Sequence, residues 1–138
     1  MRTLTVLAVV CILGCGKEMA RVPFASGGEG SANANLEGKE VSFWTDLDLE
    51  WDGTGTAQYE IELLQKGAKV ASATCSPLAR HSTRLAWVET NIGDHHTRRG
   101  QGKMSCAVDL PHGGDTVIEA TLRVKNVTIR KADLVIKQ

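Results

Sequence analysis

Residues 46–52 read Asp-Leu-Asp-Leu-Glu-Trp-Asp, an unbroken alternation of acidic and apolar side chains. In an extended chain successive side chains point to opposite faces, so Leu47, Leu49 and Trp51 share one face and the carboxylates share the other. Such a stretch is typical of a strand at the boundary between a core and water. It predicts a β-strand that is buried on one side and solvated on the other.

The same period of two continues along the chain. Gly53-Thr54-Gly55 separates residues 46–52 from a second alternating run at 57–63, and the two runs together predict a β-hairpin. Further runs occur at 69–75, 83–90, 103–110, 116–124, 127–130 and 134–136, and no helical period of useful length intervenes. We predict an all-β domain over residues 36–138, an antiparallel β-sandwich or jelly roll of about seven to nine short strands, with an open barrel as the alternative.

The first residues carry a different pattern. Met1-Arg2 supplies one positive charge, residues 4–13 form an apolar segment too short to span a bilayer, and Gly14-Cys15 follows. Residues 12–15, Ile-Leu-Gly-Cys, resemble the lipobox of bacterial lipoproteins. The alternatives are an ordinary secretory signal in which Cys15 is incidental, or a buried N-terminal helix.

The lipobox resemblance implies that residues 1–14 are a signal peptide and that Cys15 carries the lipid. The lipid would hold the protein at a membrane of the bacterial cell envelope. Gly16 and Lys17 stand where an aspartate would retain an enterobacterial lipoprotein at the inner membrane, so the outer membrane is favoured.

The segment after Cys15 lacks an apolar period. It is rich in glycine, alanine, serine and asparagine, so residues 15–35 are expected to be the lipidated cysteine and a flexible tether. The alternative is that Val22-Pro23-Phe24 forms a short edge strand docked on the domain.

Export would also determine the chemical state of each cysteine. Cys11 would leave with the leader and Cys15 would be consumed by lipid, which leaves Cys75 and Cys106. One even pair in an exported domain predicts a disulfide bond. Two separate buried thiols are the alternative if the protein is not exported, and neither cysteine has the neighbours that a zinc site needs.

Composition limits the range of functions. The chain has 138 residues, of which 42% are hydrophobic and 4% aromatic, enough for one modest core. Its 16 basic and 16 acidic residues give no reason to propose a nucleic-acid partner. No Gly-x-Ser-x-Gly, His-Glu-x-x-His, Cys-x-x-Cys or phosphate-loop motif is present, so neither an enzyme nor a cofactor is predicted.

A metal site at the acidic strand has weak support. Asp48, Glu50 and Asp52 followed by Gly53 resemble the opening of an EF-hand calcium loop, but Tyr59 stands where the loop needs a glutamate. The strand alternation already explains the spacing, so no metal is predicted. The acids could equally protect an edge strand from pairing with a neighbour.

The longest polar break, residues 91–102, is the candidate binding surface. It contains two adjacent histidines, which can both ligate a metal, and two adjacent arginines, which can bind a phosphate or carboxylate through forked hydrogen bonds. We expect a loop whose candidate residues are Asp94, His95, His96, Arg98 and Arg99.

Two further sets of residues could take part in binding. Trp44 joins the candidate surface as the least constrained tryptophan, whereas Trp51 and Trp87 fall in apolar registers and are expected in the core. His112 and Asp115 lie in a glycine-rich turn that an Asx-type turn explains.

The expected function is therefore that of a lipid-anchored envelope protein. It would act as a binding or structural accessory for a protein complex or a surface polymer, with the membrane and an envelope protein or glycan as partners. The alternatives are a carbohydrate-binding jelly-roll module and, from a different class, a small hydrolase.

Overall fold

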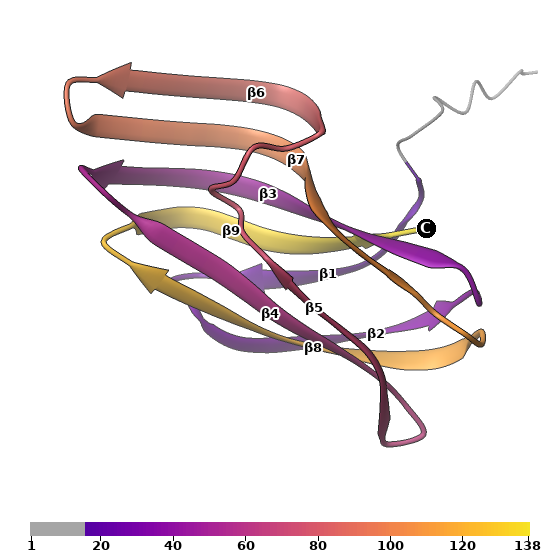
Figure 1. Ribbon diagram of the computed structural model, residues 1–138. Helices are drawn as coiled ribbons and strands as arrows, with labels where there is room; N and C mark the ends of the chain where they lie inside the picture. The colour runs from indigo at the N-terminus through magenta and orange to yellow at the C-terminus, as the bar shows by residue number, and fades with distance from the viewer. Residues whose placement is uncertain (1–15) are drawn as a thin grey trace, which may run out of the picture.

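The computed structural model describes residues 16–138, which form nine strands in two antiparallel sheets packed face to face (Figure 1). The strands are β1 (Glu18–Phe24), β2 (Gly28–Leu36), β3 (Glu40–Asp52), β4 (Thr56–Gln65), β5 (Ala68–Cys75), β6 (Thr83–Ile92), β7 (His95–Asp109), β8 (Gly114–Lys125) and β9 (Thr128–Lys137). Sheet A has the order β1-β9-β3-β7-β6 and sheet B the order β2-β8-β4-β5. The predicted all-β antiparallel sandwich is confirmed, while the proposed signal peptide and Cys15 lie outside the described residues.

Strand β3 is central to sheet A, between β7 and β9. Leu47 and Leu49 face the core and are 1% and 2% exposed, while the acids that alternate with them along β3 face outward. The Thr45 and Tyr59 hydroxyl groups lie 3.0 Å apart inside the core, and the hydrogen bond between them gives each buried hydroxyl a partner. The alternation is confirmed, but β3 has a partner on both sides, so its acids do not protect a sheet edge.

The expectation of a flexible tether over residues 15–35 is wrong for its described part. Strand β1 pairs with β9, strand β2 pairs with β8, and Val22 and Phe24 are buried in the core. A Cβ atom on Gly30 would lie 2.6 Å from Val22 Cγ1, so the missing side chain lets β1 pack closely against β2. The alternative of an edge strand at Val22-Pro23-Phe24 is thus confirmed.

The polar break at 91–102 is not a loop. The turn between β6 and β7 contains only Gly93 and Asp94, and the residues after it belong to a 15-residue strand. Figure 1 shows β6 and this part of β7 beyond the edge of sheet B. Because both faces of the hairpin meet water or polar groups there, the chain has no apolar period to reveal the strand.

The predicted disulfide between Cys75 and Cys106 is present. Cys75 ends β5, the edge strand of sheet B, and Cys106 lies in β7 of sheet A. The bond therefore links the two sheets on the side where β6 and β7 extend outward.

A β-bulge in β6 changes which side chains face the interior. The register with β7 shifts between Leu85 and Val88, and Ala86 has a φ of 49°. Leu85 and Val88 consequently both face outward, 40% and 56% exposed, while Trp87 turns inward. Simple alternation over residues 83–90 would place Leu85 and Trp87 on one face, and the bulge is the reason that they lie on opposite faces.

Candidate functional site

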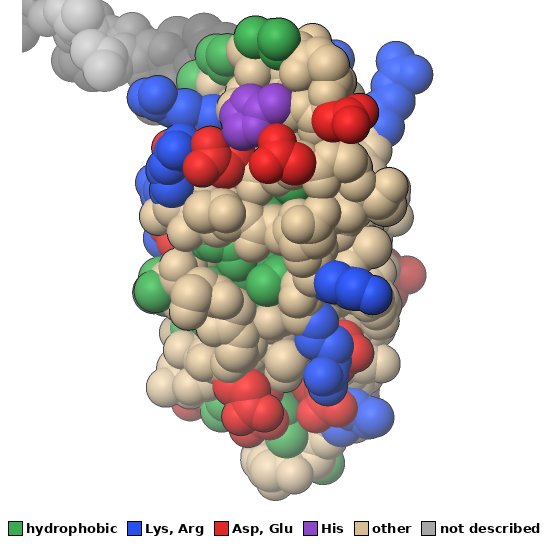
Figure 2. Space-filling model, turned by 90° about the vertical axis from the view of Figure 1, so that its left-hand side faces the viewer, with side chains coloured by type: hydrophobic (Ala, Val, Ile, Leu, Met, Phe, Trp, Pro, Cys, Tyr) green, Lys and Arg blue, Asp and Glu red, His purple; other side chains and the backbone are tan. Residues whose placement is uncertain are grey.

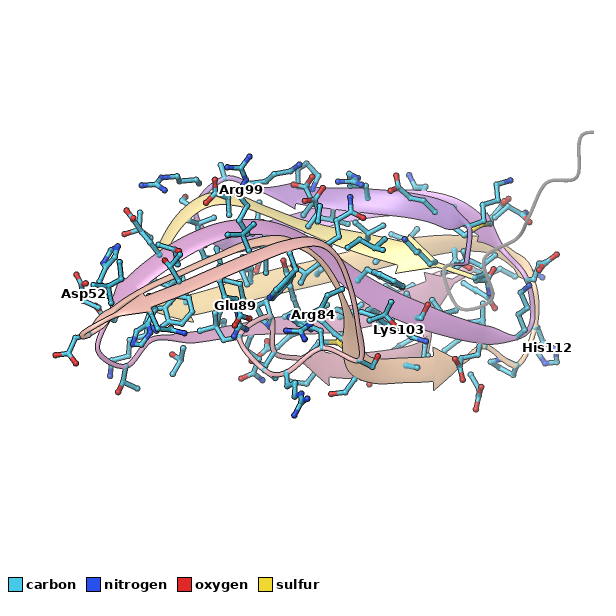
Figure 3. The ribbon with its side chains drawn as sticks, turned by 90° about the horizontal axis from the view of Figure 1, so that it is seen from above. Asp52, Arg84, Glu89, Arg99, Lys103 and His112 are labelled. Atoms are coloured by element: carbon cyan, nitrogen blue, oxygen red, sulfur yellow. A yellow bond between two sulfur atoms is a disulfide. The ribbon has the colours of Figure 1, made fainter. Side chains whose placement is uncertain are left out.

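The candidate residues of the polar segment lie on the β6–β7 hairpin, distributed over the two faces of sheet A. His96 and Arg98 pair with Trp51 and Leu49 on the inward side, whereas His95 and Arg99 pair with acids of β3 on the outward side. Figure 3 shows Arg84 and Glu89 on one side of the hairpin and Arg99 on the other. The segment therefore supplies two chemically distinct surfaces.

The inward side holds a compact group that we call the Arg98 cluster: Trp51, His81, Trp87, Glu89 and Arg98. The Arg98 guanidinium lies 5.8 Å and 5.5 Å from the ring centroids of Trp51 and Trp87 and 3.1 Å from a Glu89 carboxylate oxygen. Its Nη1 also donates to the carbonyl groups of Pro77 and Ala79. With a side chain only 15% exposed, Arg98 holds the 76–82 connection against the hairpin and is not a free binding residue.

His81 completes this cluster. Its ring is 5% exposed, packs edge-on against Trp87, and lies so close to Gly102 that a Cβ there would meet the ring at 2.7 Å. Its Nε2 lies 2.9 Å from the Pro77 carbonyl oxygen, which identifies Nε2 as the protonated nitrogen. Burial lowers the pKa of His81 below its ordinary value, and burial likewise lowers the pKa of Arg98.

At the tip of the hairpin the outward side forms an imidazole–carboxylate site, which we call the His95 end. His95 Nδ1 lies 2.7 Å from an Asp52 carboxylate oxygen, and Nε2 lies 3.8 Å from Glu50. The Gly53 amide donates to the Asp94 carbonyl, and the Asn126 amide donates to the carbonyls of Asp52 and Thr54. Figure 2 looks onto this end and shows histidine (purple) beside acidic side chains (red).

The three carboxylates that were weak candidates for metal ligands each lie close to a positive or titratable side chain. Glu50 pairs with Arg130 at 3.0 Å, Asp48 lies 3.9 Å from the same guanidinium, and Asp52 bonds to His95. No group of three or more His, Cys, Asp or Glu side chains within residues 16–138 is arranged to hold a metal ion.

A second ion network occupies the outer face of sheet A near β1. Arg21 bonds to Glu18 at 2.7 Å and to Asp46 and Asp133 at 2.9 Å, and Lys131 also reaches Asp46. Hydrogen bonds to Glu18 and the two aspartates raise the pKa of Arg21 despite the opposing effect of burial. Burial raises the pKa of Asp46, but the bonds from Arg21 and Lys131 outweigh it and hold that pKa below its usual range.

Trp44 does not belong to the exposed surface. It is 1% exposed, and the Lys137 ammonium lies 4.0 Å from its ring centroid in a cation–π contact. Trp51 and Trp87, expected in the core, pack against its margin as part of the Arg98 cluster.

Among the large apolar side chains of the described region, those on the edge strand β6 are the most exposed. Val88 and Ile92 are 56% and 76% exposed, and Leu85 shares their outward face. Arg99 and Lys103 project from the neighbouring row on β7, and neither has an ion-pair partner within 4.0 Å in the described part of the chain. A shallow hollow over Gly100 separates Val88 from Asp46 and Asp48. Apolar and cationic groups thus lie side by side along an unpaired strand.

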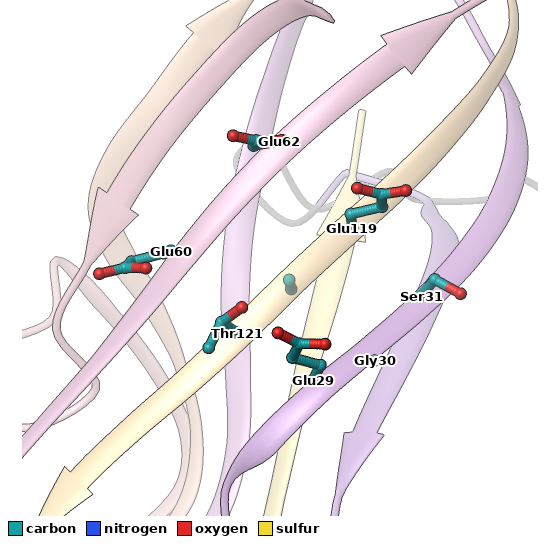
Figure 4. A pocket seen from close by; sticks show the side chains of 8 residues that line it. Glu29, Gly30, Ser31, Glu60, Glu62, Glu119 and Thr121 are labelled. Carbon is teal, nitrogen blue, oxygen red and sulfur yellow. The ribbon is translucent and has the colours of Figure 1, made fainter. Parts of the chain in front are cut away.

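Two of the depressions on the outer face of sheet B are lined mainly by polar side chains. Figure 4 shows one, in which Glu29, Glu60, Glu62 and Glu119 surround Thr121; Arg123 pairs with Glu60 at 3.0 Å. The other is a groove with an apolar floor that includes Leu64 and Val117 and a rim of polar side chains: Asn33, Asn35, Gln65, His112 and Asp115.

The sequence drew attention to only part of this groove. His112 and Asp115 stood out in their turn, whereas Asn33 and Asn35 lay in the expected tether. Asn35 donates a 2.9 Å hydrogen bond to Asp115, and the two strands that carry them are paired at this position. The alternation of small and asparagine side chains over residues 28–36 was the signal that could have revealed this strand.

The chain matches no protein-family model, no curated protein and no solved structure. Within residues 16–138, no helix is long and apolar enough to cross a membrane. The fold and its sites define the class as a disulfide-linked, two-sheet antiparallel β-sandwich with an exposed edge hairpin.

Proposed function

We propose that this protein is a lipid-anchored protein of the bacterial cell envelope that binds another protein through its β6–β7 hairpin. The observation that carries the binding role is the outward face of β6, where Leu85, Val88 and Ile92 are exposed along the unpaired edge of sheet A. Exposed apolar groups beside unpaired backbone groups favour a protein partner that adds a strand or covers the edge.

The envelope location is supported by two independent features. The N-terminal residues resemble a lipoprotein signal with Cys15 as the lipidated residue, and the domain contains a Cys75–Cys106 disulfide. Disulfides of this kind persist in the oxidising compartments that exported proteins reach. Gly16 and Lys17 after Cys15 favour the outer membrane.

The cationic row beside β6 gives the partner a chemical preference. Arg99 and Lys103 lie on β7 on the same outward face as Val88, whereas Glu89 lies on the opposite face and is already paired with Arg98. A partner segment with apolar side chains toward Val88 and acidic side chains toward Arg99 and Lys103 would complement this edge.

Site-specific photocrosslinking in intact cells tests the binding role. A photoreactive residue at Ile92 should form a covalent adduct with one envelope protein, and Val88→Glu should abolish that adduct because it places a charge in the apolar row. The same reagent at Val117, which is 38% exposed on sheet B, is the matched control. A result in which Ile92 gives no protein adduct, or in which Val117 gives the same one, would overturn the proposal.

The second candidate function is glycan binding, which the groove on sheet B favours. Amide and carboxylate side chains around Leu64 and Val117 provide the hydrogen-bonding rim and apolar floor that a hydroxyl-rich polymer needs. A pull-down with purified peptidoglycan and capsule separates the two functions. Retention that Asn33→Ala removes and Val88→Glu preserves would establish the glycan function in place of protein binding at β6.

A further inference from the structure

The chain enters the sandwich almost directly after Cys15. Strand β1 begins at Glu18, so only Gly16 and Lys17 separate it from the cysteine. Lys17 is fixed by two backbone hydrogen bonds, from its amide to the Gln138 carbonyl at 2.7 Å and from the Gln138 amide to its own carbonyl at 3.1 Å. The spacer can therefore span about 7 Å at most, whereas a disordered tether of 20 residues would span roughly 25 Å.

Three segments meet at the end of the sandwich where the spacer begins. The Gln138 side chain exchanges hydrogen bonds with the backbone of Glu37, at 2.8 Å and 2.9 Å, and the Leu110 amide donates to the Lys39 carbonyl. We call this surface the terminal end: Lys17, Gln138, residues 37–39 and residues 110–113. Figure 1 shows the C-terminus, the β2–β3 turn and the β7–β8 turn together at this end.

The terminal end is polar. Lys17, Glu37, Lys39 and His112 are exposed, and the Lys39 ammonium pairs with Glu37 at 2.7 Å. A surface of this kind can rest against zwitterionic and anionic lipid headgroups without inserting apolar side chains between acyl chains.

We infer that the terminal end lies against the headgroups of the bilayer and that the His95 end points away from it, an inference that rests on the proposed lipid at Cys15. A lipid on that cysteine places the first residues of β1 within a few ångströms of the membrane surface. Strand β3 runs from the terminal end to the His95 end over 13 residues, which corresponds to roughly 40 Å. Figure 3 shows this separation, with His112 at one end and Asp52 at the other.

This orientation assigns different surroundings to the two candidate sites. The tip of the β6–β7 hairpin stands clear of the headgroups and is open to a partner in the aqueous phase. The groove on sheet B reaches His112 and Gly113, so one mouth of it opens beside the membrane surface.

Lysine footprinting tests the orientation without altering the domain. The full-length lipidated protein is placed in phosphatidylethanolamine–phosphatidylglycerol vesicles, and mass spectrometry first verifies the lipid on Cys15. A water-soluble acylating reagent should then modify Lys39 several-fold more slowly on vesicles than in detergent-free solution of the unlipidated Cys15→Ser variant. Lys125, exposed at the opposite end, should react equally in both.

A spacer variant supplies the matched control. Insertion of a long glycine–serine segment between Gly16 and Lys17 keeps the lipid but should restore the reactivity of Lys39. A lipidated protein in which Lys39 reacts freely, or in which Lys39 and Lys125 are equally protected, would overturn the orientation. An unmodified Cys15 would instead overturn the lipid anchor itself.

Discussion

Loss of the Cys75–Cys106 bond should destabilise the domain by an amount that its loop length sets. The two cysteines are 31 residues apart, and the chain-entropy relation for a loop of that size gives about 3.7 kcal/mol at 25 °C. For a domain of this size the loss corresponds to a decrease in Tm of roughly 10 to 20 °C. The Cys75→Ala, Cys106→Ala double variant should show both changes, because the bond joins the edge of sheet B to sheet A.

Urea unfolding provides the assay. The midpoint should decrease and the slope of the unfolding free energy should increase, since the open unfolded chain exposes more surface than the crosslinked one. Reduced wild-type protein, which retains both sulfur atoms, separates loss of the bond from loss of packing at Cys75. Equal midpoints for the oxidised wild type and the double variant would refute the reasoning, as would free thiols at both positions in the purified native protein.

Three further predictions concern protonation, packing and metal binding. Burial lowers the pKa of His81 below its ordinary 6.5, so the unfolded chain binds a proton at this residue more readily than the folded protein does. The contribution of neutral His81 to the free energy of unfolding is therefore fully present above about pH 6.5 and is lost as the pH falls toward the folded pKa. His81→Gln should reduce the loss of stability that urea unfolding measures between about pH 7.5 and 5. Gly30→Ala should cost about 1 to 3 kcal/mol in urea unfolding, because the new Cβ would lie 2.6 Å from Val22 Cγ1. A calcium chelator should leave the Tm unchanged, because Asp48 and Glu50 face Arg130.

Each of these predictions has its own control. His112→Gln alters an exposed histidine and should leave the pH dependence intact; an unchanged slope in His81→Gln would show that the buried imidazole is not its source. Val22→Ala combined with Gly30→Ala should cost less than the sum of the single changes, and strict additivity would contradict the proposed clash. A decrease in Tm of several degrees on chelation would reveal a cation site among the acids of β3.

The local sequence determined the features that depend on alternating burial. Leu47 and Leu49 in β3, and Tyr59, Ile61 and Leu63 in β4, alternate with polar residues because one face of each strand meets the core and the other meets water. The pairing of Cys75 with Cys106 was also predictable, since the expected export would leave no other partner for either cysteine.

The tertiary structure alone decided the features in which buried apolar residues do not alternate with exposed polar ones. Residues 28–36 form a strand although the inward positions Gly30, Ala32 and Ala34 are small. The missing side chain of Gly30 lets Val22 approach closely, so this edge is buried without large side chains at those positions. The β6–β7 hairpin extends beyond sheet B, so polar groups are accommodated on both of its faces and its period is lost.

In the candidate surface, too, the sequence determined some features and the tertiary structure determined others. The sequence identified the histidines and arginines of residues 94–99, but it could not indicate that Arg98 lies between two tryptophans while Arg99 faces outward. It also left Trp44 unconstrained, although the structure buries it beneath Lys137. Alternation records only whether a position is buried locally, whereas the side chains that cover a residue come from strands far away in sequence, and only the assembled sheets bring them together.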